Sequence, residues 1–128
     1  MLKCKITKLA ETVWPLFYAN VPVMIYGPTG VGKSSVVKHD LIPMAEREFG
    51  TTTLHDTRLS TKDIVDGTGM PVIDKEEMAT FWTRPAFIPN DDGNMHVMFF
   101  DEFGHASVQL QQMAYSLVLD RALGGSKL

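Results

Sequence analysis

The sequence predicts an α/β fold in which helices cover both faces of a mainly parallel sheet. Two apolar runs, at 21–26 and 96–100, are rich in β-branched or aromatic side chains and have the length of buried strands. Helical patterns and a further strand pattern lie between them, as expected for parallel strands joined by crossover helices. At 128 residues and 45% hydrophobic composition, the chain predicts a single domain over 1–128.

The first part of the chain predicts helices on either side of the run at 21–26. Residues 9–17 have the apolar spacing of an amphipathic helix, and Pro15 should kink it or lie near its end. Residues 34–41 also repeat at helical spacing, until Pro43 stops or bends the helix. A short piece at 44–49 should then end at a glycine C-cap.

The remaining elements alternate between strands and helices. In chain order they are a strand at 51–59, a short helix at 61–65 capped by Ser60, a hairpin with arms 70–74 and 80–84, the strand at 96–100, a helix capped by Ser107 within 104–121, and part of a second hairpin at 120–128.

Residues 27–34 read Gly-Pro-Thr-Gly-Val-Gly-Lys-Ser, a complete phosphate-binding loop. The glycines let the backbone curl, so that several N–H groups point at phosphate oxygens. Lys33 would place a positive charge on the β- and γ-phosphates, and the Ser34 hydroxyl can bind Mg²⁺. A helix starting near Lys33 would add its positive dipole end. The predicted nucleotide-binding residues are Gly27, Pro28, Thr29, Gly30, Val31, Gly32, Lys33, Ser34 and Ser35.

The strand at 96–100 runs directly into Asp101 and Glu102, which is the acidic motif that accompanies such a loop. In a parallel sheet the carboxyl ends of the strands form the edge at which ligands bind. Asp101 would hold Mg²⁺ opposite Ser34, and Glu102 would orient and deprotonate the attacking water. The predicted metal ligands are therefore Ser34 and Asp101, and the predicted catalytic residues are Glu102 and Lys33. A merely solvated acidic strand end is the alternative interpretation.

Together these motifs resemble the AAA+ ATPases, and within them the MoxR and midasin-like branch. Five segments carry the resemblance, at 27–34, 66–71, 84–89, 99–103 and 109–114. The resemblance spans about residue 9 to the end of the chain. It implies the three-layer αβα core of P-loop nucleoside triphosphatases with a small β-hairpin insert at 70–83. It also implies binding of ATP and Mg²⁺, hydrolysis of ATP in rings, and remodelling of a protein client.

Family members continue beyond the matched region into a fourth strand with a polar sensor residue, a fifth strand and a helical lid, and they supply an arginine finger. None of these features is matched in this sequence, and Arg84 and Arg121 are interpreted as structural or surface residues. We therefore expect a core that is incomplete at its C-terminal side and that self-associates, either as a ring or by exchange of strands. Hairpin residues Phe81 and Trp82 are expected to pack, with contact to a threaded substrate as the alternative.

Two other functions stay open at this point. The chain could hold nucleotide as an assembly or binding module without turnover, or it could be a small-molecule kinase, which shares the loop but rarely needs a paired Asp-Glu on a later strand. The net charge of −3 and the lack of a basic stripe do not support nucleic-acid binding. Cys4 is the only cysteine and no apolar run approaches 18 residues, so we expect a cytoplasmic protein without a membrane anchor. The four histidines lack the spacing of a metal site.

Overall fold

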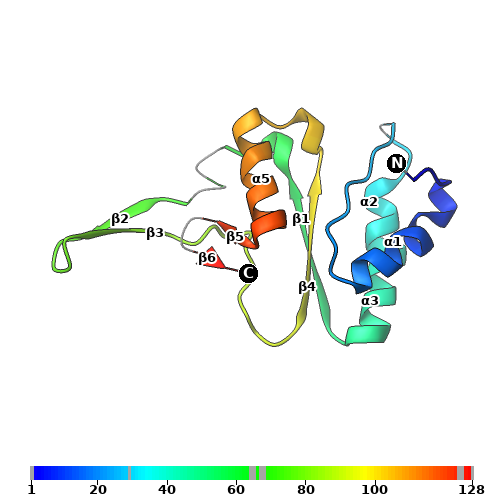
Figure 1. Ribbon diagram of the computed structural model, residues 1–128, viewed down its shortest axis with the longest axis horizontal. Helices are drawn as coiled ribbons and strands as arrows, with labels where there is room; N and C mark the ends of the chain where they lie inside the picture. The colour runs from blue at the N-terminus through cyan, green and yellow to red at the C-terminus, as the bar shows by residue number, and fades with distance from the viewer. Residues whose placement is uncertain (1, 29, 64–65, 67–68, 124–125, 128) are drawn as a thin grey trace. The chain divides into compact units, whose positions relative to one another are not determined.

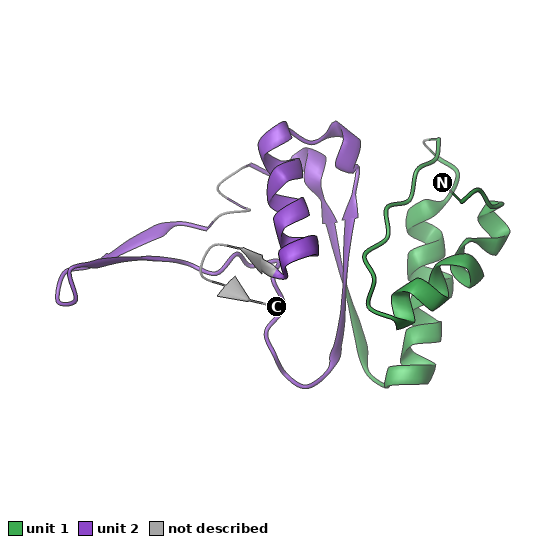
Figure 2. Cartoon of the chain, viewed as in Figure 1, with its two compact units in different colours: residues 1–54 green, residues 55–128 purple. Residues whose placement is uncertain are grey.

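The computed structural model describes residues 2–28, 30–63, 66, 69–123 and 126–127 (Figure 1). The chain forms two compact units, residues 1–54 and residues 55–128 (Figure 2). The phosphate-loop motif belongs to the first unit and the acidic motif to the second.

Apart from the first residues of β1, the regular elements of the first unit are helices. Its elements are η1 (Ile6–Lys8), α1 (Leu9–Tyr18), α2 (Lys33–Val36), η2 (Val37–Leu41) and α3 (Ile42–Phe49). The core joins α1 to the helices that follow the loop, because Leu9, Val13 and Leu41 are buried together. Trp14, Phe17, Ile25 and Val36 pack around them. The predicted helix at 9–17 is confirmed, with Pro15 in its last turn.

The helix after the phosphate loop does not stop at Pro43 but passes through a π-helical turn. Residues Val37–Leu41 form this turn, and the N–H of Ile42 donates to the carbonyl of Val37, five residues earlier. Pro43 has no N–H, and in a regular α-helix its ring would collide with the carbonyl of residue 39. The wider turn opens the ladder at this point, and α3 then continues to its glycine C-cap, Gly50, as predicted.

The expectation of a first buried strand at 21–26 is wrong. The structure assigns no strand to these residues, and most of their side chains are exposed, from 39% for Val23 to 75% for Tyr26. Only Ile25 turns into the core of the unit. An apolar run becomes a strand only where a neighbouring strand accepts its backbone hydrogen bonds, and none of the described strands pairs with this segment.

The second unit contains the sheet elements. In chain order they are β1 (Thr52–Arg58, which begins in the first unit), η3 (Leu59–Thr61), β2 (Pro71–Asp74), β3 (Ala79–Trp82), β4 (Met95–Asp101), η4 (Phe103–His105), α5 (Val108–Asp120), β5 (Ala122–Leu123) and β6 (Ser126–Lys127). Strands β1 and β4 form a parallel pair, while β2 with β3 and β5 with β6 form antiparallel pairs (Figure 1).

Helix α5 provides the apolar side chains that close the core of the second unit. Leu110, Met113 and Ala114 of α5 are buried with Leu59, which directly follows β1, and Phe100 of β4 packs against them. The helix begins as predicted, because the Ser107 side chain accepts a hydrogen bond from the Leu110 N–H at 3.3 Å.

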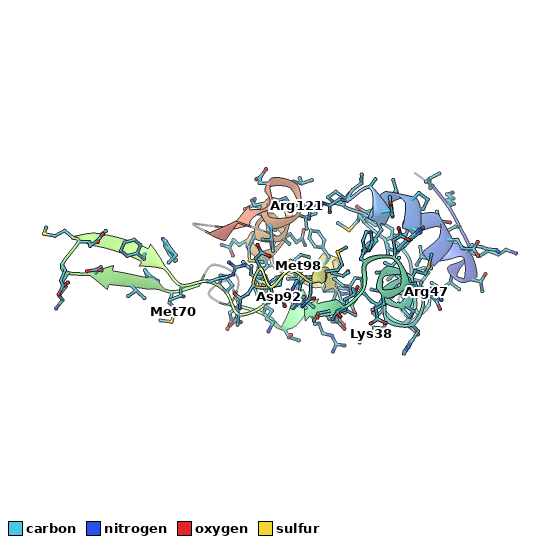
Figure 3. All side chains as sticks on the ribbon, turned by 90° about the horizontal axis from the view of Figure 1, so that it is seen from below. Lys38, Arg47, Met70, Asp92, Met98 and Arg121 are labelled. Carbon is cyan, nitrogen blue, oxygen red and sulfur yellow. The ribbon has the colours of Figure 1, made fainter. Side chains whose placement is uncertain are left out.

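The hairpin of β2 and β3 extends away from the rest of the second unit (Figure 3), with Met70 at its base. Its register pairs Pro71 with Trp82 and Asp74 with Ala79, which confirms the predicted hairpin. Phe81 and Trp82 are 52% and 54% exposed, so the expectation that they pack is wrong. A hairpin of two strands has no second layer against which these side chains could be buried.

The remaining sequence predictions have mixed outcomes. The strands predicted at 51–59 and 96–100 are confirmed as β1 and β4. The helix predicted at 61–65 is wrong over its described residues, because η3 ends at Thr61 and Lys62 is extended, while residues 64 and 65 lie outside the described part. The fold is thus mixed α/β with one parallel strand pair and antiparallel hairpins. None of the described helices has the length and apolarity needed to cross a bilayer.

Candidate nucleotide site

The phosphate loop turns directly into a helix. Gly30 and Gly32 adopt φ values of +81° and +94°, a left-handed conformation that residues with a Cβ rarely adopt. Gly32 is the N-cap of α2, and its carbonyl accepts the first helical bond from the Val36 N–H at 3.0 Å. The backbone N–H groups of the first turn of α2 thus lie directly after the loop, and N–H groups at this position of a helix are the donors that typically bind anions.

The Lys33 side chain folds back over the start of its own loop. Its Nζ donates to the carbonyl oxygen of Gly27 at 2.6 Å and lies 3.3 Å from that of Pro28. Two carbonyl dipoles therefore solvate the ammonium group in place of a phosphate. An anion entering the loop would compete with these carbonyls for the same N–H donors.

The other predicted loop residues sit around this lysine. Ser34 is half-buried at the second position of α2, while Val31 and Ser35 are exposed. An added Cβ on Gly27 would meet Lys33 Cδ and Val31 Cγ2 at ordinary contact distances of 3.7 Å. Thr29 lies outside the described residues. The loop thus brings Gly27, Pro28 and Lys33 into direct contact.

The acidic pair lies at the carboxyl end of β4. Asp101 is the last residue of the strand and is half-buried, and its Oδ1 accepts a hydrogen bond from the Glu102 N–H at 2.8 Å. Glu102 adopts φ 55° and ψ 35°, a left-handed conformation that is uncommon for a residue other than glycine. This turn ends the strand.

Two residues, one at the end of β1 and one in η3 directly after it, hold the Glu102 carboxylate. The Ser60 Oγ donates to Glu102 Oε2, and Arg58 Nε lies 3.8 Å from Glu102 Oε1. The ion pair is weak, because the two side chains are 62% and 40% exposed and water screens their charges. Both oxygens of Glu102 therefore have protein partners, and the carboxylate is tied to the neighbouring strand.

The sequence predicted no functional role for Arg58, and it predicted Ser60 only as a helix cap. The signal that could have found them is their position. Both residues lie at or just after the end of β1, and carboxyl ends of paired parallel strands meet at the same edge. The predicted metal ligands are divided between the units, with Ser34 in the first and Asp101 in the second.

The first unit also contains a small apolar hollow beside α1 and α2. Its lining residues are Leu9, Ala10, Val13, Ile25, Val36, Val37 and Leu41. Val36, three residues after Lys33, is the lining residue that follows the loop most closely in sequence, and all of the lining side chains are apolar.

Comparisons of the chain with protein-family models, with curated proteins and with solved structures give no match. The loop, the acidic pair and the residues in contact with them are therefore the basis for assigning a function.

Proposed function

We propose that this chain is an ATP-binding P-loop core of the AAA+ type, in which the full three-layer αβα arrangement binds Mg-ATP. The observation that carries the proposal is the turn from the glycine loop into α2 at Lys33. Gly30 and Gly32 have the backbone conformation that such a loop needs, and the helix that begins at Lys33 places its first-turn N–H groups beside the Lys33 ammonium group.

The donor groups fit a phosphate bound with a hard divalent cation. The Ser34 hydroxyl and the Asp101 carboxylate offer oxygen ligands, which Mg²⁺ prefers over nitrogen or sulfur. Bound Mg²⁺ would neutralise charge on the β- and γ-phosphates. Lys33 would release the carbonyls of Gly27 and Pro28 and donate to phosphate oxygens instead. For the adenine ring we propose a contact near α1, which packs against the helices that follow the loop.

Glu102 is our candidate for the base that deprotonates the water molecule, which then attacks the γ-phosphate. Lys33 would contact the phosphates and Asp101 would hold Mg²⁺. To act, its carboxylate must leave Ser60 and Arg58, because a carboxylate that already accepts hydrogen bonds is a weaker base. These contacts favour a second candidate function, a module that holds nucleotide without turnover.

For the hydrolysing form we propose self-association and a protein client. We also propose that the protein is located in the cytoplasm.

The test is calorimetric titration of the chain with Mg-ATP, with Lys33→Ala as the loop variant and Lys38→Ala as the matched control on the next helical turn. We expect micromolar binding that is weakened at least tenfold in Lys33→Ala and unchanged in Lys38→Ala. Absence of binding by the unmodified chain, or equal binding by Lys33→Ala, would overturn the proposal.

Release of inorganic phosphate then separates the two candidate functions. Hydrolysis that is lost in Glu102→Gln, with nucleotide binding retained, supports the ATPase. Tight binding without measurable release of phosphate supports the nucleotide-holding module.

A further inference from the structure

Three polar side chains form a continuous chain of hydrogen bonds across the β1–β4 pair. His55 of β1 and His96 of β4 meet with 2.9 Å between His55 Nε2 and His96 Nδ1. The other ring nitrogen of His96, Nε2, lies 2.7 Å from Oδ1 of Asp92 in the preceding loop. Neither ring is fully exposed, and the His96 side chain is only 17% exposed.

This geometry limits the number of protons that the two rings can hold. A carboxylate only accepts hydrogen bonds, so His96 Nε2 must carry a proton to donate to Asp92. The contact between His96 Nδ1 and His55 Nε2 needs one proton between the two nitrogens, and a second would place two N–H groups head to head. The intact arrangement therefore accommodates no more than one of the two imidazoles as an imidazolium.

The electrostatics of the site agree with this proton count. Burial lowers the pKa of the His55 imidazole below its usual value, and the neighbouring His96 lowers it further, while Asp92 acts in the opposite direction. Hydrogen bonds from His96 and from the Asn94 N–H lower the pKa of Asp92 to about 2. The groups that act on His55 are thus His96 of β4 and Asp92 of the loop, and Asp92 stays ionised throughout the range in which histidines titrate.

The His55–His96 contact is important for the stability of the β1–β4 pair, because this sheet is small. β1 and β4 form a sheet of two strands among the described residues, and pairs of strands are marginally stable without further contacts. Cross-strand side-chain contacts supply a substantial part of the stability of such a pair. His96 lies about 20 Å along the chain from Glu102, so this contact acts on strand pairing and not on the acidic pair directly.

We propose that His55, His96 and Asp92 form a proton-operated latch, in which one proton shared between the two histidines joins β1 to β4 and a second proton releases them. Above the ordinary titration range of histidine the latch is closed. As the pH falls below about 6.5, the unfolded chain binds a proton on both imidazoles while the closed latch accommodates only one. The folded state therefore loses stability toward acid. The latch does not depend on nucleotide binding, so its failure would leave the proposed function standing.

The first test is urea unfolding of the chain between pH 5 and pH 8. One proton fewer in the folded state predicts an unfolding constant that rises up to about tenfold for each pH unit lowered below 6.5. We expect His55→Gln to remove this dependence. The matched controls His39→Gln and His105→Gln change exposed imidazoles and should retain it. A flat profile for the unmodified chain, or an unchanged slope in His55→Gln, would overturn the latch.

The second test needs no variant and therefore stands even if His55→Gln fails to fold. Long-range ¹H–¹⁵N spectra of the imidazoles report the tautomer of each ring. At pH 8 we expect His96 protonated on Nε2 and His55 protonated on Nε2, with both rings responding together as acid is added. Independent titration of the two rings, or His96 protonated on Nδ1 at pH 8, would contradict the proposal.

Discussion

The hydroxyl of Ser60 donates a hydrogen bond to the carboxylate of Glu102, although the two residues lie 42 positions apart in the chain. The contact joins the end of β1 to the end of β4, and Arg58 approaches the other oxygen of the same carboxylate. The group that we propose as the catalytic base is therefore restrained by the strand beside it.

Removing the Ser60 hydroxyl should release this restraint. If the chain hydrolyses ATP, we expect Ser60→Ala to raise turnover at saturating ATP by up to about tenfold, since one such hydrogen bond contributes roughly 1.4 kcal/mol. Phosphate release measured beside Glu102→Gln provides the check. Ser107→Ala is a poor control because it removes a helix cap, so the control is Ser116→Ala, an exposed serine of α5 outside the loop, which should leave turnover unchanged. A fall in turnover for Ser60→Ala would assign Ser60 a direct part in the reaction.

The backbone of Glu102 predicts an unusual response to substitution. A side chain with a Cβ costs roughly 1 kcal/mol in the left-handed conformation, which glycine adopts freely. Glu102→Gly should therefore retain or raise the free energy of unfolding, by up to about 1 kcal/mol, whereas the β-branched Glu102→Val should lower it by about 1–2 kcal/mol. Urea denaturation measures both, and the opposite ranking would show that Glu102 is not held in this conformation.

The Lys33 contacts should matter for binding and not for folding. The bonds to Gly27 and Pro28 are exposed, and water replaces an exposed hydrogen bond at little cost. We expect Lys33→Ala to change the free energy of unfolding by less than about 0.5 kcal/mol. Thermal denaturation without nucleotide tests this. A large loss of stability would mean that the variant cannot serve as a pure binding control.

Two leucines of α5 offer a matched pair for the core of the second unit. Leu110 is 3% exposed and buried with Leu59, whereas Leu119 is 68% exposed. Truncation of Leu110 to alanine should cost about 2–5 kcal/mol through lost burial and a cavity, and truncation of Leu119 less than about 0.5 kcal/mol. Equal effects in urea unfolding would show that α5 packs through a different face.

Gly69 should be required at the base of the β2–β3 arm. Its φ is +78°, and a Cβ at this position would collide with the backbone carbonyl of Thr83. Thr83 also receives the Met70 N–H on its Oγ1 at 2.7 Å. We expect Gly69→Ala to lower the protection of the arm's amides in hydrogen exchange by at least tenfold. Gly93→Ala is the control, since Gly93 also has positive φ but faces open space. Its effect should stay confined to its own turn.

Patterns that depend on local chemistry predicted the structure well. Ser107 caps α5, the glycine after Phe49 ends α3, and the polar turn region at 74–77 joins the two arms of the hairpin. Each of these features is decided by residues within a few positions of one another. The loop from Gly27 to Lys33 belongs to the same class, because φ values and the helix start follow from the local sequence.

Features that depend on a distant partner were predicted less well. The run at 21–26 is apolar enough for a strand, but a strand needs a neighbour, and composition alone does not supply one. The partners of Glu102 were missed for the related reason that Ser60 lies 42 residues away. The His55–His96 contact spans 41 residues and carries no recognisable spacing. In each case the deciding information is the pairing of β1 with β4, or the absence of a pairing.

The π-helical turn at Val37–Leu41 determines which side chains of the following helix are buried. It contains one residue more than an α-helix needs to cover the same rise, so everything after it is rotated by about 100° relative to an uninterrupted helix. Deleting one residue here would restore a regular helix but would turn the buried side chains of Ile42 and Ala45 away from the core. The ring of Phe49, now stacked on Tyr18, would be displaced with them. The extra residue therefore fixes which side of α3 faces the core. For this reason we expect α3 not to tolerate insertions or deletions in the preceding turn, even though much of its surface is exposed.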